Sequence, residues 1–313
     1  MGTLHQVITE HGAATARSMA DTKTDVLAVD AAAAVMSDED GRLAITHAGF
    51  AMTNLPHKPI VENVWMRKGQ NTTLLIESGR DSNGKQIGVP YGSMARLILL
   101  YLQTEAIRTG GPEVALGRSM KNWMERMGIE RGGSTYRRLA EQSLKISSCR
   151  LTFFSDHGSA EVRENGAFVR GAISLIGLED SKQPTLWQDK VRLDDGFWRS
   201  LRDHPVPVRE EAIQAISSRS FAIDVYIWLA YRLHALSKPT PVTWAALHSQ
   251  FGAGFKHVRQ FKPRFLESLT LALAVYPEAC VDVGEGGVKL HPSAPAIPRA
   301  EAKRLGISWR GTW

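Results

Sequence analysis

The chain has 313 residues, of which 43% are apolar and 22% charged, a composition that can build hydrophobic cores and excludes wholesale disorder. Its length suits about two domains. The net charge of +6 and the pI near 9.4 favour a polyanionic partner, although many soluble enzymes are equally basic. No run approaches the ~20 apolar residues that a membrane span needs, and the N-terminus has no secretory signal. We therefore expect a cytoplasmic protein with no membrane partner.

The positive charge is unevenly distributed along the chain. Residues 89–178 hold 12 basic and 8 acidic residues, and residues 179–313 hold 18 and 14, whereas residues 1–88 hold 8 and 10. The surplus of cations therefore lies in residues 89–178 and 179–313.

In chain order, residues 1–44 come first and are poor in large apolar side chains, which predicts a flexible N-terminal tail with a short helix near 26–36. Gly110 stops a strongly apolar helix in the segment that follows. The elements of that segment are expected in this order: strands at 61–66 and 72–77, a helix over 93–109, a strand at 113–116, and helices over 119–127 and 134–148.

The second half of the chain repeats this order less regularly. An aspartate caps the helix over 194–202, and Thr243 caps another that runs through about 251. The remaining elements are expected as a strand at 191–193 and helices over 210–217, 221–236 and about 260–274. Residues 293–313 are expected to form a peripheral C-terminal tail.

One pattern occurs twice, a basic amphipathic helix that runs directly into a β-hairpin. The first hairpin is expected at 149–154 and 167–178, and the second at 279–283 and 288–290. Helix, strand, helix, helix and hairpin is the order of a winged-helix DNA reader, and two copies suggest two related modules. The predicted fold class is therefore α+β, with tandem winged-helix domains over 45–178 and 185–292.

The cysteines occupy equivalent places in the two copies, each at the start of a hairpin. With only two cysteines, Cys149 and Cys280, a chain of this length does not indicate a disulfide scaffold. We expect both to be small buried apolar residues in a reducing cytoplasm.

The first basic helix offers hydroxyl and amide groups for base edges and cations for phosphates. Leu139 and Leu144 are expected to turn inward. A solvated helix face is the default alternative for a single helix of this kind. The candidate DNA-binding residues of this helix are Ser134, Thr135, Arg137, Arg138, Gln142 and Lys145.

The second basic segment, 255–264, contains no acidic residue, whereas solvated helix faces usually mix charges of both signs. Pro263 is expected in the first helical turn, where proline is tolerated. The cations would then crowd the loop and the first turn. The candidate DNA-binding residues here are Lys256, His257, Arg259, Gln260, Lys262 and Arg264.

No catalytic or cofactor motif stands out. Residues 79–85 fit the GxxxxGK pattern of a phosphate loop, but Gln86 replaces the required Ser or Thr, and a hairpin turn at 83–84 explains the glycines. No histidine pair has metal-ligand spacing, and no GxSxG elbow occurs. We expect no enzymatic activity, no cofactor and no metal.

Several segments, in order, resemble the plasmid-encoded RepA replication initiators. They are GVPYGSMARLILLYLQTEAIRTG from Gly88, ALGRSMKNWMERMGIERGGSTYRRL from Ala115, AIDVYIWLAYRL from Ala222, and the tyrosine-proline-glutamate at 276–278. The resemblance covers about residues 60–295. By position, 134–145 would be the first reader helix and 259–264 the start of the second, although Pro263 departs from the family pattern.

The resemblance implies a function as well as a fold. Such initiators bind directly repeated sites (iterons) in double-stranded origin DNA, open adjacent AT-rich DNA, and recruit the host initiator and replicative helicase. It also implies a homodimer through the first domain, where helix 93–109 could serve as core or as interface. The alternative is a winged-helix transcription regulator that acts at its own promoter. The iteron sequence, the host and copy-number control do not follow from the chain.

Overall fold

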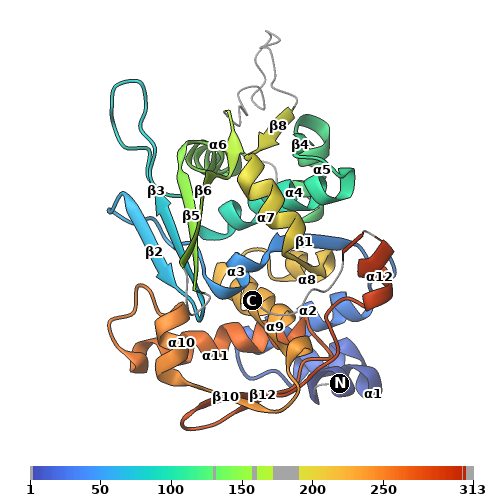
Figure 1. The fold of residues 1–313 in the computed structure, drawn as a ribbon. Coiled ribbons are helices and arrows are strands. Elements are labelled where there is room, and N and C mark those ends of the chain that lie inside the picture. Colours follow the sequence, from blue (N-terminus) through green and yellow to red (C-terminus); the bar gives the residue numbers. More distant parts are fainter. Residues whose placement is uncertain (1–2, 130–131, 157–160, 172–189, 305, 308–313) are drawn as a thin grey trace. The chain divides into compact units, whose positions relative to one another are not determined.

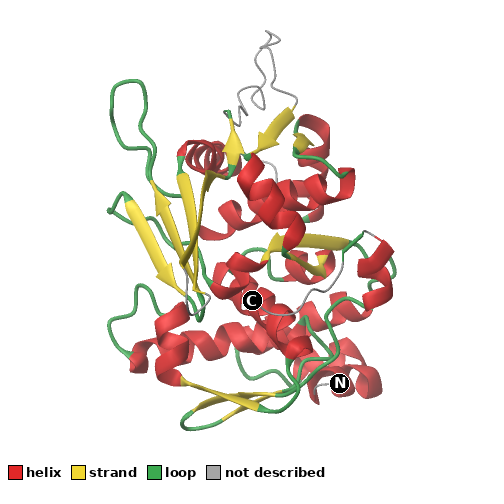
Figure 2. Ribbon diagram, in the orientation of Figure 1, coloured by secondary structure: helices red, strands yellow, loops and turns green. Residues whose placement is uncertain are grey.

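The computed structural model describes residues 3–129, 132–156, 161–171, 190–304 and 306–307. It divides into two compact units, which we call unit A, residues 45–205, and unit B, residues 1–44 with 206–313 (Figure 1). Strands β1 (Leu43–His47) and β9 (Pro205–Arg209), in which the chain passes between the units, form a two-stranded sheet. Helices and sheets are mixed in both units, which confirms the α+β class (Figure 2).

Unit A contains the first of the two predicted modules. Its helices are α3 (Ala48–Met52), α4 (Gly92–Thr109), α5 (Gly117–Arg126), α6 (Gly133–Ser148) and α7 (Asp195–Asp203). Its other strands are β2 (Val64–Lys68), β3 (Thr72–Glu77), β4 (Glu113–Ala115), β5 (Arg150–Asp156), β6 (Glu161–Ala167), β7 (Val169–Arg170) and β8 (Lys190–Leu193). The predicted order of helix, strand, helix, helix and hairpin is confirmed for α4 to β6.

Two antiparallel sheets organise unit A. The larger has the order β2–β3–β5–β6, and in it Leu74 pairs with Phe153 and Ile76 with Leu151. These four side chains are buried, because alternate residues of a strand point to the same face of the sheet. The smaller sheet has the order β4–β8–β7.

Helix α4 is the buried centre of unit A. It ends at Gly110, whose φ of 71° is the left-handed conformation that glycine adopts at helix ends. Residues 97–100 are all buried, and Ile98 is fully so. The helix therefore acts as core, and it offers no exposed apolar face for a dimer contact.

Two expectations for this part of the chain are corrected, and a third is confirmed. The second hairpin strand is β6, at 161–167 instead of 167–178, and residues 172–178 of that range lie outside the described residues. The first domain does not end at 178, because β8 and α7 belong to unit A. Helix α7 begins after Asp194, whose side chain accepts the backbone N–H groups of Gly196 and Phe197, so the predicted aspartate cap is confirmed.

Unit B contains the second module. Its remaining helices are α1 (Thr3–Ser18), α2 (Lys23–Met36), α8 (Glu210–Ala215), α9 (Ser220–Arg232), the short 3₁₀ turn η1 (Leu233–Ala235), α10 (Trp244–Phe251), α11 (Val258–Ala274) and α12 (Arg299–Arg304). Its strands are β10 (Thr240–Thr243), β11 (Val281–Val283) and β12 (Gly287–Leu290), in the order β10–β12–β11. Helices α9, α10 and α11 and the hairpin follow the predicted order, and strand β10 forms where no strand was expected.

Aromatic side chains fill the core of unit B behind α11. Their ring centroids lie 5.4–6.4 Å apart in tilted and edge-on pairs. Such pairs add stability beyond their buried area. The cluster consists of Phe221, Trp228, Trp244, Phe251, Phe261 and Phe265.

The expected flexible N-terminal tail is wrong. Residues 3–18 and 23–36 form α1 and α2, and the side chain of Thr22 caps α2 in a reciprocal box with Asp25. Helix α2 packs against α8 and α11, and Ala28 and Ala32 are buried in that contact. Small side chains let helices approach closely, so the scarcity of large apolar residues here does not signal disorder.

The C-terminal tail and one cysteine also differ from expectation. Ala296 and Ile297 are buried, and the hydroxyl of Tyr276 donates to the carbonyl of Ala294 at 2.7 Å, so the segment after 293 packs onto unit B. Cys149 is buried as expected, and burial raises the pKa of its thiol. Cys280 is exposed, contrary to expectation.

Across the residues that the structure describes, every helix is too short or too polar to cross a membrane.

Candidate nucleic-acid interface

Helix α6 turns one face into unit A and the other to solvent. Leu139 and Ile146 are buried on the inner face together with the polar Gln142 and Ser143. Of the predicted residues, Ser134, Arg137 and Arg138 are exposed and Thr135 is half-buried. Hydroxyl groups and guanidinium groups therefore share the outer face of the first two turns.

The prediction that Gln142 contacts DNA is wrong, because Gln142 does not belong to the outer face. Its side chain is 2% exposed, and its Oε1 accepts the backbone N–H of Tyr91 at 2.8 Å. Tyr91 is the N-cap of α4 and its own side chain does not cap the helix. Gln142 therefore ties α6 to the start of α4, and it cannot reach a base without breaking that bond.

Lys145 lies at the edge of the same face and is engaged on two sides. Its Nζ is 2.8 Å from Oε1 of Glu141 and 4.5 Å from the centre of the Tyr91 ring. The Tyr91 hydroxyl also donates to Glu141, at 3.1 Å, and burial followed by this carboxylate raises the pKa of Tyr91. Sequence reasoning missed Tyr91 and Glu141, although the i, i+4 spacing of Glu141 and Lys145 is the signal for such a pair.

Leu144 is a second correction on α6. It was expected to turn inward, but it is 50% exposed. The buried positions 139, 142, 143 and 146 define an inner face that leaves Leu144 on the opposite side.

Helix α11 begins earlier than expected, so Pro263 does not lie in its first turn. It starts at Val258 after an N-cap at His257, which places Pro263 in the second turn. A proline there lacks the N–H that would bond the carbonyl of Arg259, so the helix tolerates one lost internal hydrogen bond. The expectation that Pro263 lies in the first helical turn is therefore wrong.

The predicted DNA-binding residues of this region fall into two groups. Lys256, His257, Arg259 and Gln260 are exposed in the loop before α11 and in its first turn. Lys262 stacks its Nζ 4.8 Å above the Trp244 ring, and Arg264 pairs with Glu267 at 2.9 Å. The first group keeps its side chains in solvent, as an electrostatic contact with phosphates requires.

The phosphate-loop candidate is a turn, as predicted. Gly84 has a φ of 78°, the backbone N–H of Asp81 donates to the carbonyl of Lys85, and that of Ile87 donates to the carbonyl of Gly79. These bonds close a hairpin loop between β3 and α4. Such a loop does not present helix N-terminal amides to a phosphate.

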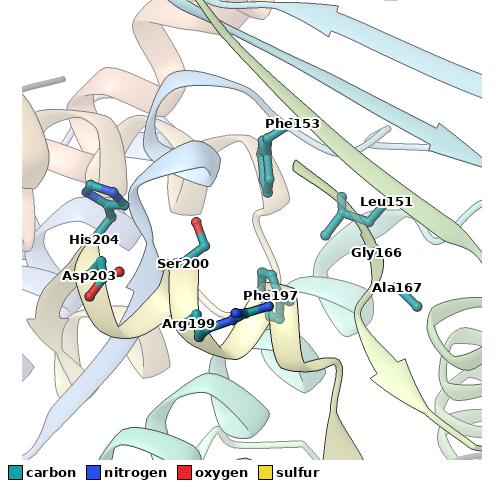
Figure 3. A pocket seen from close by; sticks show the side chains of 10 residues that line it. Leu151, Phe153, Gly166, Ala167, Phe197, Arg199, Ser200, Asp203 and His204 are labelled. Atoms are coloured by element: carbon teal, nitrogen blue, oxygen red, sulfur yellow. The ribbon is translucent and has the colours of Figure 1, made fainter. Parts of the chain in front are cut away.

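A hollow of about 300 Å³ lies in unit A between β5 and α7 (Figure 3). Phe153 from β5 and Phe197 and Ser200 from α7 face each other across it. Ser200 also contacts His47, which accepts the N–H of Gly49 at Nδ1, so that its Nε2 donates to the Ser200 hydroxyl at 2.9 Å. Burial, and then His204, lower the pKa of His47 to about 3. None of the predicted DNA-binding residues lines this hollow.

No cluster of metal-ligating side chains occurs within the described residues. The predicted DNA-binding residues lie on α6 in unit A, and on α11 and the loop before it in unit B.

Comparison with known proteins bears on this arrangement. Residues 89–245 match the model of a family described as plasmid encoded RepA protein. The chain belongs to this family. The RepA match confirms the resemblance on sequence, and it makes the chain a member of a plasmid replication initiator family. The match contains the whole of α6 and ends at Ala245, before α11.

Two solved structures of RctB are similar to the chain. One contains domains 2 and 3 as selenomethionine derivatives, at 8% identity and a TM-score of 0.48, and covers 79% of this chain and 96% of its own. The other contains residues 155–483 of RctB, at 10% identity and a TM-score of 0.46, and covers 77% and 93%. No curated protein matches the chain.

Proposed function

We propose that this RepA family member binds directly repeated sites in double-stranded DNA at a plasmid origin, through two winged-helix modules. In this proposal α6 and α11 are the reader helices. Binding would promote opening of the origin and recruit the host initiator and replicative helicase. Membership of a replication initiator family supports the proposal.

One observation carries the assignment to these helices. Each unit buries one side of a helix in its core and leaves cations exposed on the other, Arg137 and Arg138 on α6 and Arg259 on α11, with Lys256 just before it. A helix that fits the major groove and carries cations at its start can contact phosphates and base edges together. Two different readers in one chain favour long, asymmetric, directly repeated sites over a palindrome.

We also propose that the protein acts by binding, without enzymatic activity or a cofactor. The turn at residues 79–87 supports this, because the one segment with a nucleotide-binding pattern is closed by its own backbone. A homodimer through the first domain stays a proposal that rests on the family resemblance. The burial of residues 97–100 takes α4 away as support for it.

The salt dependence of binding tests the proposal. Fluorescence anisotropy would measure the affinity of the full chain for duplex DNA taken from beside its coding region. The logarithm of the affinity should fall linearly with the logarithm of salt concentration, with a slope of about −0.9 for each phosphate neutralised. Replacing Arg137 and Arg138 by alanine should make that slope shallower. A flat salt response of the unchanged protein would contradict the proposal.

A further inference from the structure

The outer face of α6 carries a carboxylate whose presence needs an explanation. Glu141 is the acidic residue of α6, and its side chain is 41% exposed, between the cations Arg138 and Lys145. A carboxylate on a surface that approaches DNA is repelled by phosphates. It is therefore compatible with binding only where it meets a hydrogen-bond donor instead of a phosphate.

Unit A holds this carboxylate in one orientation. Its Oε1 receives both the Lys145 ammonium, at 2.8 Å, and the Tyr91 hydroxyl, at 3.1 Å. Its Oε2 has only a weaker contact, at 3.4 Å from the same hydroxyl. A carboxylate oxygen accepts two hydrogen bonds or more, so Oε2 keeps acceptor capacity for a ligand.

The two groups that hold Glu141 are themselves fixed. The side chain of Lys145 is only 13% exposed, since its Nζ lies above the Tyr91 ring. The backbone of Tyr91 is bonded to the buried Gln142, one residue beyond Glu141 on α6. The carboxylate is therefore oriented before any ligand arrives, and little side-chain entropy remains to be lost on binding.

We propose that Glu141 determines base specificity by accepting a hydrogen bond from the N4 amino group of a cytosine in the major groove. Of the base edges in that groove, cytosine and adenine present amino donors, whereas guanine and thymine present acceptors that a carboxylate repels. Carboxylates pair with the cytosine N4 group, and adenine is the partner of Asn and Gln, which both donate and accept. In this arrangement Tyr91 acts as a positioning residue, through Glu141.

The inference rests on α6 being a reader helix, as proposed above, and selection from a random duplex pool tests it. Full-length wild-type protein and its Glu141→Gln variant would each select binding sequences. At one position, wild type should prefer cytosine over guanine or thymine about tenfold. Glu141→Gln should shift that position towards adenine and leave the others unchanged. Tyr91→Phe should weaken the cytosine preference at the same position less than Glu141→Gln does.

Glu105→Gln is the matched control, because Glu105 also pairs with a cation on a helix, Arg108 of α4, away from the predicted reader face. It should leave the selected sequences unchanged. Glu141→Asp, which keeps the charge but shortens the side chain, should lose the cytosine preference without gaining adenine. Unchanged preferences in Glu141→Gln, or a uniform rise in affinity for all sequences, would overturn the inference. Failure of the wild type to select any sequence would instead overturn the proposed function.

Discussion

Helices α6 and α11 both expose cations to solvent, but different interactions hold the two helices in their units. Gln142 on the inner face of α6 binds the backbone of Tyr91, and Ser143 is buried beside it. On α11 the equivalent side consists of Phe261 and Phe265, which are fully buried among other rings. Hydrogen bonds are directional and modest in net strength, whereas apolar burial is strong and non-directional. The orientation of α6 should therefore depend on a few polar contacts, and that of α11 on the integrity of its core.

The outer faces differ as well. The exposed segment 256–260 before and within α11 has no acidic residue, which suits contacts with phosphates of any sequence. The face of α6 carries Glu141 among its cations, which suits discrimination between bases. The comparison suggests that α11 contributes mainly affinity, and α6 mainly specificity.

Removal of residues 1–42 should have the largest effect and should affect only one side of this comparison. Helix α2 buries Ala28, Val29, Ala32 and Val35 against its unit and packs on α11, so unit B should lose its cooperative unfolding. Limited proteolysis with mass spectrometry would identify the cleaved segments. Cleavage should appear within 206–307 and not in α6, whereas Met19→Ala, at a site that is 63% exposed, should change nothing. Equal cleavage of both units would contradict the prediction that only unit B depends on residues 1–42.

The substitution Phe265→Ala should have the next largest effect. The ring is fully buried and contacts Phe221, Trp228 and Phe251, so truncation should lower the free energy of unfolding by about 3–5 kcal/mol. Chemical denaturation followed by tryptophan fluorescence would measure it. Leu144→Ala on α6, at a site that is half exposed, is the control and should stay within about 0.5 kcal/mol. A similar loss in both variants would mean that Leu144 is core.

A pair of glutamine variants sharpens the comparison directly. Gln142→Leu leaves the Tyr91 N–H without its acceptor and should cost about 1–3 kcal/mol in unfolding free energy. Gln260→Leu on the exposed first turn of α11 should cost less than about 0.5 kcal/mol. Both would be measured by urea denaturation. If the two variants lose the same stability, polar contacts do not set the position of α6.

The smallest expected effect concerns pH and unit A. The pKa of His47 is about 3 in the folded protein against 6.5 unfolded, so on acidification the unfolded chain takes up a proton that the folded chain refuses. The free energy of unfolding is therefore not lowered by His47 above about pH 6.5, and it falls progressively as the pH drops from there towards 3. At pH 5.5 the loss should be about 1.4 kcal/mol. His47→Gln should show a correspondingly smaller fall between pH 7 and pH 5.5, and an identical fall would contradict the assignment.

How far the sequence predicts the structure depends on the kind of signal. Periodic apolar residues and end signals such as Gly110, Asp194 and Thr243 gave the helices of both modules within a few residues. Helix α1 was missed, and where α2 forms only a short helix within a flexible tail was expected, because alanines that pack closely resemble the composition of a tail. The boundary at 178 was misplaced because β8 pairs with β4, 75 or more residues earlier in the chain, and nothing local encodes that pairing.

The site shows the same limit. Arg137, Arg138 and Arg259 are exposed as charge alone predicts, since burial of an unpaired guanidinium is costly. Gln142 was misassigned because a polar side chain on a basic helix is usually exposed. Its partner is the backbone N–H of Tyr91, 51 residues earlier in the chain. The contacts of the folded chain show that position 142 belongs to the inner face and position 141 to the outer one.

The central claim is that α6 and α11 read separate halves of one DNA site, and a footprint tests it most directly. Hydroxyl-radical footprints of the full-length protein on a single origin repeat would be compared for wild type, Arg138→Ala and Arg259→Ala. The account predicts that protection is lost at one end of the repeat for Arg138→Ala and at the opposite end for Arg259→Ala. Loss of protection at the same end for both variants would contradict it.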